Sequence, residues 1–261
     1  MCRWLAYTGA EVFLEQLIFE PENSLARQSL SAQHTNWPTN GDGFGVGWYG
    51  TRDEPGLFRD VLPAWNDSNL RNVSAQIQSG LFFAHVRAST GASTSRTNCH
   101  PFRYGPWLFM HNGQIGGFET VRRTLMLDVE PELFRYIHGS TDSELFFYLL
   151  LTYGGSDDPQ GAFTRAVNRV LEVMHQFDIE APFRMSAALT NGKTVYALRF
   201  ASDDQAPSLF YGEADTLVRA DGVLIASEPL GTDPGPWQEV PQRQFLTVTG
   251  GDVAAIPFVS A

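Results

Sequence analysis

The amino-acid sequence predicts an α+β protein in which helices cover two β-sheets. Segments of strand length come first, a block of helices follows, and short strands return after residue 183. Residues 159–177 carry apolar side chains at helical spacing. Asn191-Gly192 separates two apolar runs, which is typical of a β-hairpin turn. No linker interrupts this pattern, so we expect a single domain over residues 1–261.

The first part of the chain alternates expected strands with two helical regions. Glycine alternates with large residues in 44–49, which favours a strand in close backbone contact, and 57–62 would be its hairpin partner. Asp67 can begin a helix that ends at Gly80. The expected strands are 2–8, 44–49, 57–62, 81–87 and 107–112, and the expected helical regions are 10–30, interrupted near Pro21, and 67–80.

The second part of the chain holds the block of helices and the later strands. Apolar periodicity predicts the helices, and the last of them is the longest. Two strands flank the Asn-Gly turn, and further short strands are expected up to the end of the chain. The expected helices are 118–127, 131–136, 142–153 and 159–177, and the expected strands are 184–190 and 194–200, with others near Leu209, Leu217, Val223, Phe245 and Val253.

The chain is acidic, because 18 Lys and Arg oppose 29 Asp and Glu, which leaves a net charge of -11. Phosphate backbones and anionic membrane surfaces repel such a chain, so we expect neither nucleic acid nor a membrane as a partner. No apolar run reaches the length of a membrane span, and the N-terminus has no secretory pattern. Two cysteines make no disulfide framework, so a cytoplasmic protein is expected.

Cys2 is a candidate nucleophile because of its position. A free cysteine usually packs as a small apolar residue. A small second residue, however, normally allows removal of Met1, and this would leave an α-amine beside the thiol. Such an amine has a pKa of about 7.7–8.0 and can act as a general base near neutral pH. The position of Cys2 alone leaves both interpretations open.

Residues 109–113 (Phe-Met-His-Asn-Gly) end an expected strand. The Asn-Gly pair is either a simple turn or an oxyanion hole. In an oxyanion hole, the Asn112 amide and the Gly113 N–H would converge on a developing negative oxygen. Glycine permits both the unusual backbone conformation and the close approach that this requires.

Two charged residues suit the recognition of charged ligand groups. Arg87 stands at the end of an apolar strand, where it either binds a carboxylate bidentately or forms a structural ion pair. Thr141 or Asp142 can cap the next helix, and acids are favoured in a first turn for that reason alone. Alternatively, the Asp142 carboxylate faces an ammonium group of a substrate.

The sequence lacks the motifs of several other kinds of active or binding site. Residues 43–47 are glycine-rich but have neither the Lys-Ser/Thr of a phosphate loop nor the order of a dinucleotide fingerprint. No histidine has the spacing of a zinc site, and no Gly-x-Ser-x-Gly elbow supports a serine hydrolase. We interpret Cys99 as a packing residue, with a second thiol near the site as the alternative. We interpret four histidines as hydrogen-bonded structural residues, namely His85, His100, His111 and His138.

Six motifs follow one another along the chain: residues 1–3 (Met-Cys-Arg), 41–48 (Gly-Asp-Gly-Phe-Gly-Val-Gly-Trp), 85–87 (His-Val-Arg), 98–102 (Asn-Cys-His-Pro-Phe), 111–113 (His-Asn-Gly) and 141–144 (Thr-Asp-Ser-Glu). In this order and spacing they resemble the class II glutamine amidotransferases, a family of N-terminal-nucleophile hydrolases. Residues 226–230 (Ala-Ser-Glu-Pro-Leu) with Trp237 resemble the free-standing branch of that family. The resemblance covers essentially the whole chain.

This resemblance implies a four-layer αββα sandwich of two mainly antiparallel sheets, the fold of the N-terminal-nucleophile hydrolases. It implies that Cys2 is the nucleophile and that its freed α-amine is the base. It also implies that Asn112 and Gly113 form the oxyanion hole.

The same resemblance assigns the recognition of a glutamyl head group. Arg87, assisted by Thr90, would bind the α-carboxylate, and Asp142 would bind the α-ammonium group. A zwitterionic head group needs one partner of each sign, which explains why the two residues occur together. These groups complete the chemistry, so neither a metal nor an organic cofactor is expected.

The expected activity is that of an amidohydrolase acting on glutamine or a γ-glutamyl amide, through a thioester that water hydrolyses to glutamate. The chain ends at Ala261 with no synthase domain, so it resembles the free-standing γ-glutamyl hydrolases of glutathione or ergothioneine metabolism. One alternative is a glutaminase subunit that supplies ammonia to a separate synthase partner. Another is a catalytically silent scaffold that binds γ-glutamyl compounds.

Overall fold

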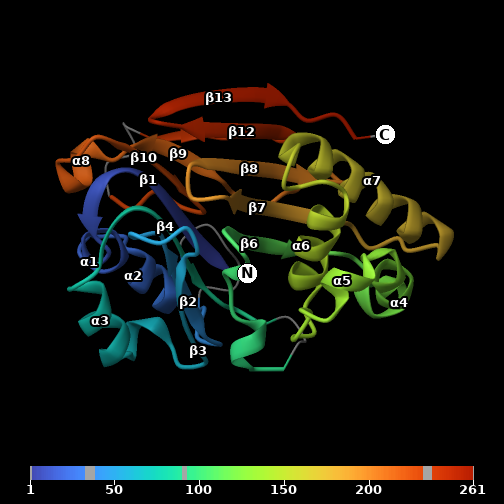
Figure 1. The fold of residues 1–261 in the computed structure, drawn as a ribbon, viewed down its shortest axis with the longest axis horizontal. Helices are drawn as coiled ribbons and strands as arrows, with labels where there is room; N and C mark the ends of the chain where they lie inside the picture. Colours follow the sequence, from blue (N-terminus) through green and yellow to red (C-terminus); the bar gives the residue numbers. More distant parts are fainter. Residues whose placement is uncertain (1, 33–38, 90–92, 232–236, 261) are drawn as a thin grey trace.

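The computed structural model describes residues 2–32, 39–89, 93–231 and 237–260. These residues form two antiparallel sheets that pack against each other, with helices on both outer sides (Figure 1). The N-terminus lies near the middle of the molecule, where the two sheets meet, and the C-terminus lies beyond the edge of the second sheet (Figure 1).

The first sheet has the N-terminal strand at its centre. Its strands, in spatial order, are β11 (Trp237–Glu239), β9 (Phe210–Glu213), β10 (Gly222–Ala226), β1 (Arg3–Phe13), β4 (Gln78–Val86), β2 (Phe44–Trp48) and β3 (Gly56–Asp60). The expected hairpin of β2 and β3 is confirmed. The glycines of β2 allow close backbone approach, since a Cβ at Gly45 would lie 2.0 Å from the carbonyl oxygen of His100.

The second sheet contains the later strands of the chain. In spatial order they are β13 (Asp252–Pro257), β12 (Gln244–Thr249), β8 (Thr194–Ala201), β7 (Arg184–Thr190), β6 (Trp107–Gln114) and β5 (Phe102–Tyr104). The predicted turn between β7 and β8 is confirmed: Gly192 has a φ of 86°, and Asn191 Oδ1 accepts from the amides of Lys193 and Thr194.

Helices cover the outer faces of both sheets. All the helices on the first sheet are short, whereas the second sheet carries the long helices, and Asp158 caps the longest of these. On the first sheet are α1 (Glu15–Ile18), α2 (Leu25–Leu30), α3 (Ser68–Ser74) and α8 (Asp215–Val218), and on the second are α4 (Phe118–Asp128), α5 (Pro131–Phe134), α6 (Asp142–Thr152) and α7 (Pro159–Gln176). Two 3₁₀ turns, η1 (Ala64–Asn66) and η2 (Arg96–Asn98), lie in the connecting loops.

Apolar clusters fill the three spaces between these layers. Leu5 and Tyr7 belong to the cluster beneath α1–α3, whereas Trp4 and Ala6 belong to the cluster between the two sheets. Successive residues of β1 thus point alternately to the helices and to the space between the sheets, as strand geometry requires. The same alternation, continued by one residue past a strand end, decides whether the next side chain faces the space between the sheets.

Three of the expected elements are wrong in type or extent. Residues 10–13 are strand rather than helix, because a bulge between Thr8 and Val12 lets β1 continue beside β4. Helix α3 ends at Ser74 rather than Gly80, since β4 begins at Gln78. The segment around Leu217 is the one-turn helix α8 rather than a strand, and a short apolar run does not distinguish the two.

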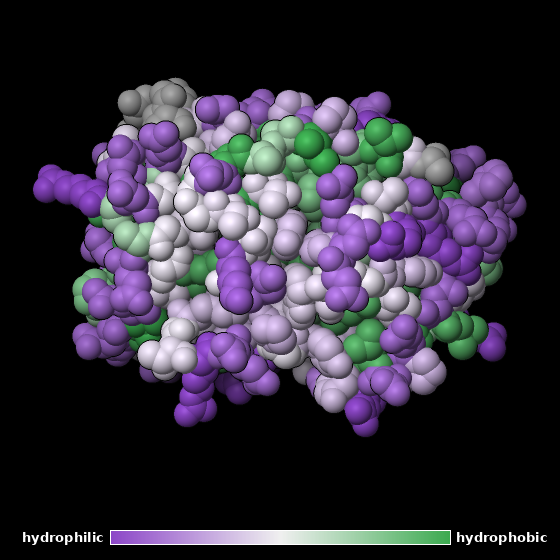
Figure 2. Space-filling view, turned by 45° about the horizontal axis from the view of Figure 1, so that its top comes forward, coloured by the Kyte–Doolittle hydropathy of each residue, from purple (hydrophilic) through white to green (hydrophobic). Residues whose placement is uncertain are grey.

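The face of the molecule shown in Figure 2 is chemically mixed. Figure 2 turns the top of Figure 1 forward and shows apolar side chains in small groups between polar ones. Within the described ranges, no helix combines the length and apolar character that crossing a bilayer would require. The same ranges hold no group of three or more His, Cys, Asp and Glu side chains arranged to bind a metal ion.

Candidate active site

Three strand ends converge where the two sheets meet. The start of β1 lies beside the end of β4, since Arg3 pairs with Val86, and β6 of the second sheet packs against both strands. Trp4, Phe83 and Met110 point from these strands into the space between the sheets. The strand alternation continues on this same side to Cys2, Arg87 and Asn112.

Cys2 lies directly before β1, and its side chain is half-buried. Its Sγ lies 3.5 Å from the backbone nitrogen of Ala88, which donates to it, and 3.6 Å from the carbonyl oxygen of the same residue. Burial raises the pKa of the Cys2 thiol, whereas the Ala88 amide and the charges of Arg87 and Arg3 act in the opposite direction. The net shift is upward, so these surroundings do not by themselves make the thiol acidic.

The indole of Trp4 ties the two sheets together beside Cys2. Trp4 Nε1 donates to the carbonyl oxygen of Ser186 at 3.1 Å, and Ser186 stands opposite Asn112 in the pairing of β6 with β7. The nucleophile candidate and the oxyanion-hole candidate are therefore fixed relative to each other through one buried hydrogen bond.

Asn112 has an unusual environment for a buried amide. Its side chain is 1% exposed, yet neither Nδ2 nor Oδ1 has a hydrogen-bond partner within the described part of the chain. A buried amide without partners is costly, by about 1–3 kcal/mol, and a catalytic role is one reason for a protein to keep such a group. The amide therefore keeps its hydrogen-bonding capacity unused on the side of the sheets that Cys2 also faces.

Gly113 can only be glycine in this position. Its φ is 147°, and a Cβ would lie 1.9 Å from the carbonyl oxygen of Arg184 and 2.7 Å from His111 Nε2. The sequence therefore places glycine here because β6 turns tightly against β7. The simple β-turn interpretation of Asn112-Gly113 is wrong, since both residues belong to β6.

Arg87 follows β4 and is 4% exposed. Its Nη1 donates to the carbonyl oxygen of Asp42 at 3.3 Å, and its Nη2 donates to Ser89 Oγ at 3.1 Å. Asp42 also bonds with the residue that Arg87 contacts, because Asp42 Oδ2 accepts from the Ser89 amide at 2.7 Å. The loop before β2 thus holds the guanidinium, whose charge acts on the Cys2 thiol. Thr90, predicted to assist Arg87, lies outside the described residues.

Asp142 is the first residue of α6, and Thr141 is the N-cap, with its Oγ1 accepting from the Glu144 amide. The Asp142 carboxylate accepts from the amides of Ile115 at 2.8 Å and Ser143 at 2.8 Å. It therefore ties the start of α6 to the chain just beyond Gly113. Two carboxylate oxygens offer about four acceptor positions, so an ammonium group can still bind there.

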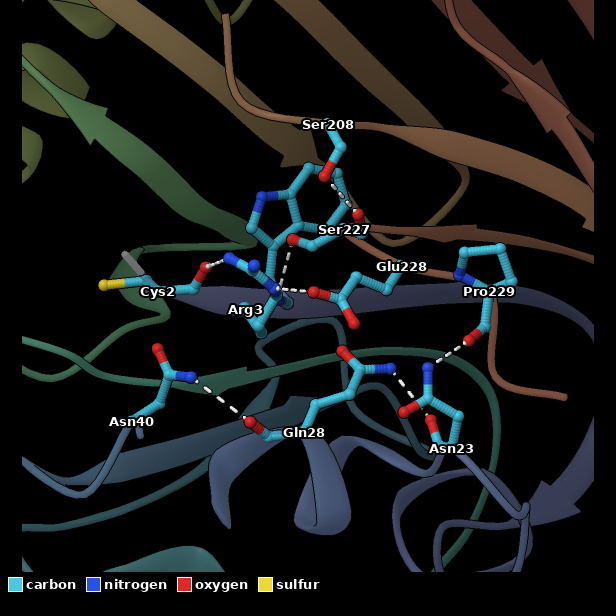
Figure 3. A network of polar contacts seen from close by, with 10 residues as sticks. Cys2, Arg3, Asn23, Gln28, Asn40, Ser208, Ser227, Glu228 and Pro229 are labelled. Atoms are coloured by element: carbon cyan, nitrogen blue, oxygen red, sulfur yellow. Dashed lines mark hydrogen bonds and ion pairs between the residues drawn. The ribbon is translucent and has the colours of Figure 1, made fainter. Parts of the chain in front are cut away.

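A charged pair that the sequence did not connect lies next to Cys2 (Figure 3). Arg3 Nη1 donates to the carbonyl oxygen of Cys2 at 2.8 Å, and Arg3 Nε donates to Glu228 Oε1 at 2.6 Å. Both side chains are buried. Glu228 belongs to the motif at 226–230, but nothing local indicates that it meets a residue 225 positions away.

The interpretation of the histidines as hydrogen-bonded residues holds only in part. His111 Nδ1 bonds with Ser143 Oγ at 2.8 Å, and His85 Nε2 donates to the carbonyl oxygen of His111 at 3.3 Å. His100 differs, because neither ring nitrogen has a partner within the described ranges and the ring stacks on His85 at 4.1 Å. Burial lowers the pKa of all three rings, that of His85 to about 3.

Comparisons with known proteins agree on one family. A profile of the family described as "Glutamine amidotransferases class-II" matches residues 19–260. A Saccharomyces cerevisiae protein named "Probable glutamine amidotransferase DUG3" is 33% identical over 99% of this chain and 85% of its own. The gamma-glutamyl-hercynylcysteine sulfoxide hydrolase of Mycolicibacterium smegmatis is 27% identical over 98% of this chain and all of its own.

Solved structures share the fold. A glutamine aminotransferase class-II domain protein from Silicibacter pomeroyi has a TM-score of 0.77 and 38% identity, and covers 98% of this chain and 99% of its own. The glutamine phosphoribosylpyrophosphate amidotransferase of B. subtilis has a TM-score of 0.67 at 14% identity, covers 99% of this chain and 50% of its own, and supports the fold alone. The expected α+β fold, with two antiparallel sheets between helical layers, is confirmed.

Proposed function

This chain belongs to the class II glutamine amidotransferases, and from that premise we propose that it hydrolyses a γ-glutamyl amide with Cys2 as the nucleophile. The observation that carries the proposal is the buried Asn112 amide without partners, which lies on the same side of the sheets as Cys2. Such an amide is a ready donor for an oxyanion that forms only during reaction.

The first step is the attack of Cys2 Sγ on the γ-carbonyl carbon of the substrate. Removal of Met1 frees the α-amine of Cys2, whose reference pKa of about 7.7–8.0 allows it to accept the thiol proton near neutral pH. Because burial raises the pKa of the thiol, the amine is needed for activation. The amine then passes this proton to the leaving ammonia or amine as the C–N bond breaks.

Asn112 Nδ2 and the Gly113 N–H would stabilise the oxyanion of the tetrahedral intermediate. The restricted backbone of Gly113 supports this role, because the tight packing against Arg184 fixes the direction of its peptide group. Preorganised donors of this kind contribute about 2.7–4 kcal/mol each to transition-state stabilisation. Water finally hydrolyses the γ-glutamyl thioester, which releases glutamate and restores the Cys2 thiol.

The substrate head group would lie between Arg87 and Asp142. The guanidinium fork of Arg87 suits an α-carboxylate, and the Asp142 carboxylate suits an α-ammonium group. Thr90 would assist Arg87. This arrangement restricts the substrates to those with a free amino-acid head, namely glutamine and γ-glutamyl amides.

A second candidate function is a glutaminase subunit that delivers ammonia to a separate synthase. It is favoured by the relative whose name describes an amidotransferase rather than a hydrolase. The two functions differ in their dependence on a partner, because a hydrolase turns over its substrate alone whereas a subunit is slow until its partner binds.

The test is release of glutamate from glutamine and a panel of γ-glutamyl amides and peptides. The purified protein is first checked by mass to begin at Cys2, and Cys2→Ala and Cys99→Ala are the matched variants. We expect release without a partner that depends on Cys2 and not on Cys99. No release from a chain that begins at Cys2 would reject the free-standing hydrolase and direct the search to a partner-dependent subunit or a silent binding protein.

A further inference from the structure

We infer that Glu228 is a positioning residue for the reaction: through Arg3 it fixes the carbonyl group of Cys2, and with it the direction of the α-amine and thiol of that residue. This inference rests on the proposed function of Cys2 and adds a residue from the far end of the sequence to its site. Figure 3 shows Arg3 between the two groups that it joins.

The planar guanidinium of Arg3 bonds both with the backbone of Cys2 and with the side chain of Glu228. Its Nη1 donates to the Cys2 carbonyl oxygen at 2.8 Å, and its Nε donates to Glu228 Oε1 at 2.6 Å. The planar fork holds these directions in a fixed relation, which a lysine ammonium could not do. The position of the Glu228 carboxylate therefore determines the plane of the peptide that follows Cys2.

The energetics indicate that stability is not the reason for this pair. Arg3 is 1% exposed and Glu228 is 0% exposed. The desolvation of two buried charges largely offsets their attraction, and apolar residues of similar volume often serve folding equally well. A buried pair that contacts the backbone of the nucleophile is better explained by the geometry that it imposes.

The backbone around Trp4 provides the second anchor. The Ser227 amide donates to the Trp4 carbonyl oxygen at 3.0 Å, and Ser227 Oγ accepts from the Trp4 amide at 3.0 Å. Cys2 lies just outside the strand, where the ladder of β1 no longer sets its orientation. Ser227 thus fixes the strand end, and Glu228 acts one step further out through Arg3.

Glu228 itself stands on a rigid support. A series of hydrogen bonds leads from its neighbour Pro229 to the loop that holds Arg87 (Figure 3). In order, Asn23 Nδ2 donates to Pro229 O at 2.7 Å, Gln28 Nε2 to Asn23 O at 2.8 Å, and Asn40 Nδ2 to Gln28 O at 3.2 Å. Asn40 lies two residues before Asp42, whose carbonyl oxygen accepts from Arg87.

The experiment replaces the pair by apolar residues in the full-length protein, as Arg3→Met with Glu228→Leu. Every variant is checked by mass to begin at Cys2, and kcat and KM for glutamate release are measured. We expect kcat to fall about 100-fold, the size of effect that a displacement of about 1 Å produces, with KM unchanged within about threefold. The matched control removes the partly exposed pair of α7 and α4, as Arg169→Met with Asp128→Leu, and should retain kcat.

Two single variants separate geometry from packing. Glu228→Gln keeps an acceptor oxygen for Arg3 Nε and should retain more of kcat than the pair deletion. Arg3→Lys keeps the charge but loses the fork, so its kcat should fall with KM unchanged. If the double variant does not fold, the kcat and KM of Arg3→Lys test the inference instead, with the same expected fall in kcat at unchanged KM.

The inference is overturned if kcat of a folded variant stays within about threefold of the parent, or if KM rises as much as kcat falls. The proposed function fails in a different way, because the parent protein would then release no glutamate from any γ-glutamyl compound. An active parent with equally active variants rejects only the role of Glu228.

Discussion

The two cysteines of this chain lie in contrasting surroundings. Cys2 is half-buried at a strand end between the sheets, whereas Cys99 is fully buried beside η2. The thiol of Cys99 contacts the carbonyl oxygens of Asp60 at 3.4 Å and Ser95 at 3.5 Å. Burial raises the pKa of Cys99 to about 11 and also raises the pKa of Cys2.

Thiol acidity therefore does not distinguish the nucleophile candidate from the packing residue. What differs is access from solvent, the unpartnered Asn112 amide on the same side of the sheets as Cys2, and the α-amine that removal of Met1 would free in the proposed mechanism. The surroundings of the sulfur alone therefore do not single out Cys2, and the proposed role of Cys2 depends also on its place next to Met1.

The largest expected difference is between the two cysteine variants. Cys2→Ala should lower kcat for γ-glutamyl amide hydrolysis by about 10,000-fold or more, because no other group can form the thioester. Cys99→Ala should leave kcat within about twofold, since its thiol only packs. Released glutamate measures both. Equal losses in the two variants would end the distinction between the cysteines.

Two asparagines extend the comparison. Asn112→Ala should lower kcat about 100- to 1,000-fold with little change in KM, since it would remove a donor to the proposed oxyanion. Asn98, beside Cys99, bonds with Ser93 O and with both Ser140 N and Oγ, so Asn98→Ala should instead lower the free energy of unfolding by about 1–3 kcal/mol. Steady-state kinetics and urea unfolding of both variants check that Asn112→Ala mainly lowers kcat and that Asn98→Ala mainly lowers stability.

The histidines near Cys99 predict acid sensitivity of the fold. Burial lowers the pKa of His85 to about 3, whereas an unfolded histidine binds its proton near pH 6.5. The unfolded state therefore takes up more protons as the pH falls below 6.5, and at pH 5 His85 alone should lower the free energy of unfolding by about 2 kcal/mol. Urea unfolding from pH 7 to pH 5 measures this, with His85→Gln as the variant that flattens the dependence. Stability that does not change over this range would contradict a buried neutral His85.

The smallest expected effect concerns Asp142, which lies close in sequence to Ser140, a partner of Asn98. Asn98 holds Ser140, and two residues later the Asp142 carboxylate accepts from the Ile115 amide. Asp142→Asn keeps an acceptor for that amide but loses the charge, so KM for glutamine should rise about tenfold with kcat less affected. A glutamine analogue without the α-amino group is the control, and its kinetics should not change. An equal rise in KM for the analogue would show that Asp142 acts through the fold.

The sequence predicts the locally determined parts of the fold well. The β2–β3 hairpin, the turn at Asn191 and the helices from α4 to α7 each depend on periodicity or turn chemistry within a few residues. The end of the helix at Ser74 and the continuation of β1 past Thr8 escaped prediction, because neighbouring strands decide both. The packing of His100 escaped for a similar reason, since His100 lies in the loop before β5 and His85 stacks on it from the distant strand β4.

The sequence by itself determined that this chain is an acidic α+β protein with the ordered motifs of one enzyme family, because composition, periodicity and motif order are properties of the linear chain. Only the tertiary structure decided that Cys2, Arg87 and Asn112 lie on the same side of their strands, since register and alternation turn three distant strand ends toward the space between the two sheets. It likewise joined Arg3 to Glu228, because a pairing over 225 residues depends on the order of β1 and β10 in the sheet.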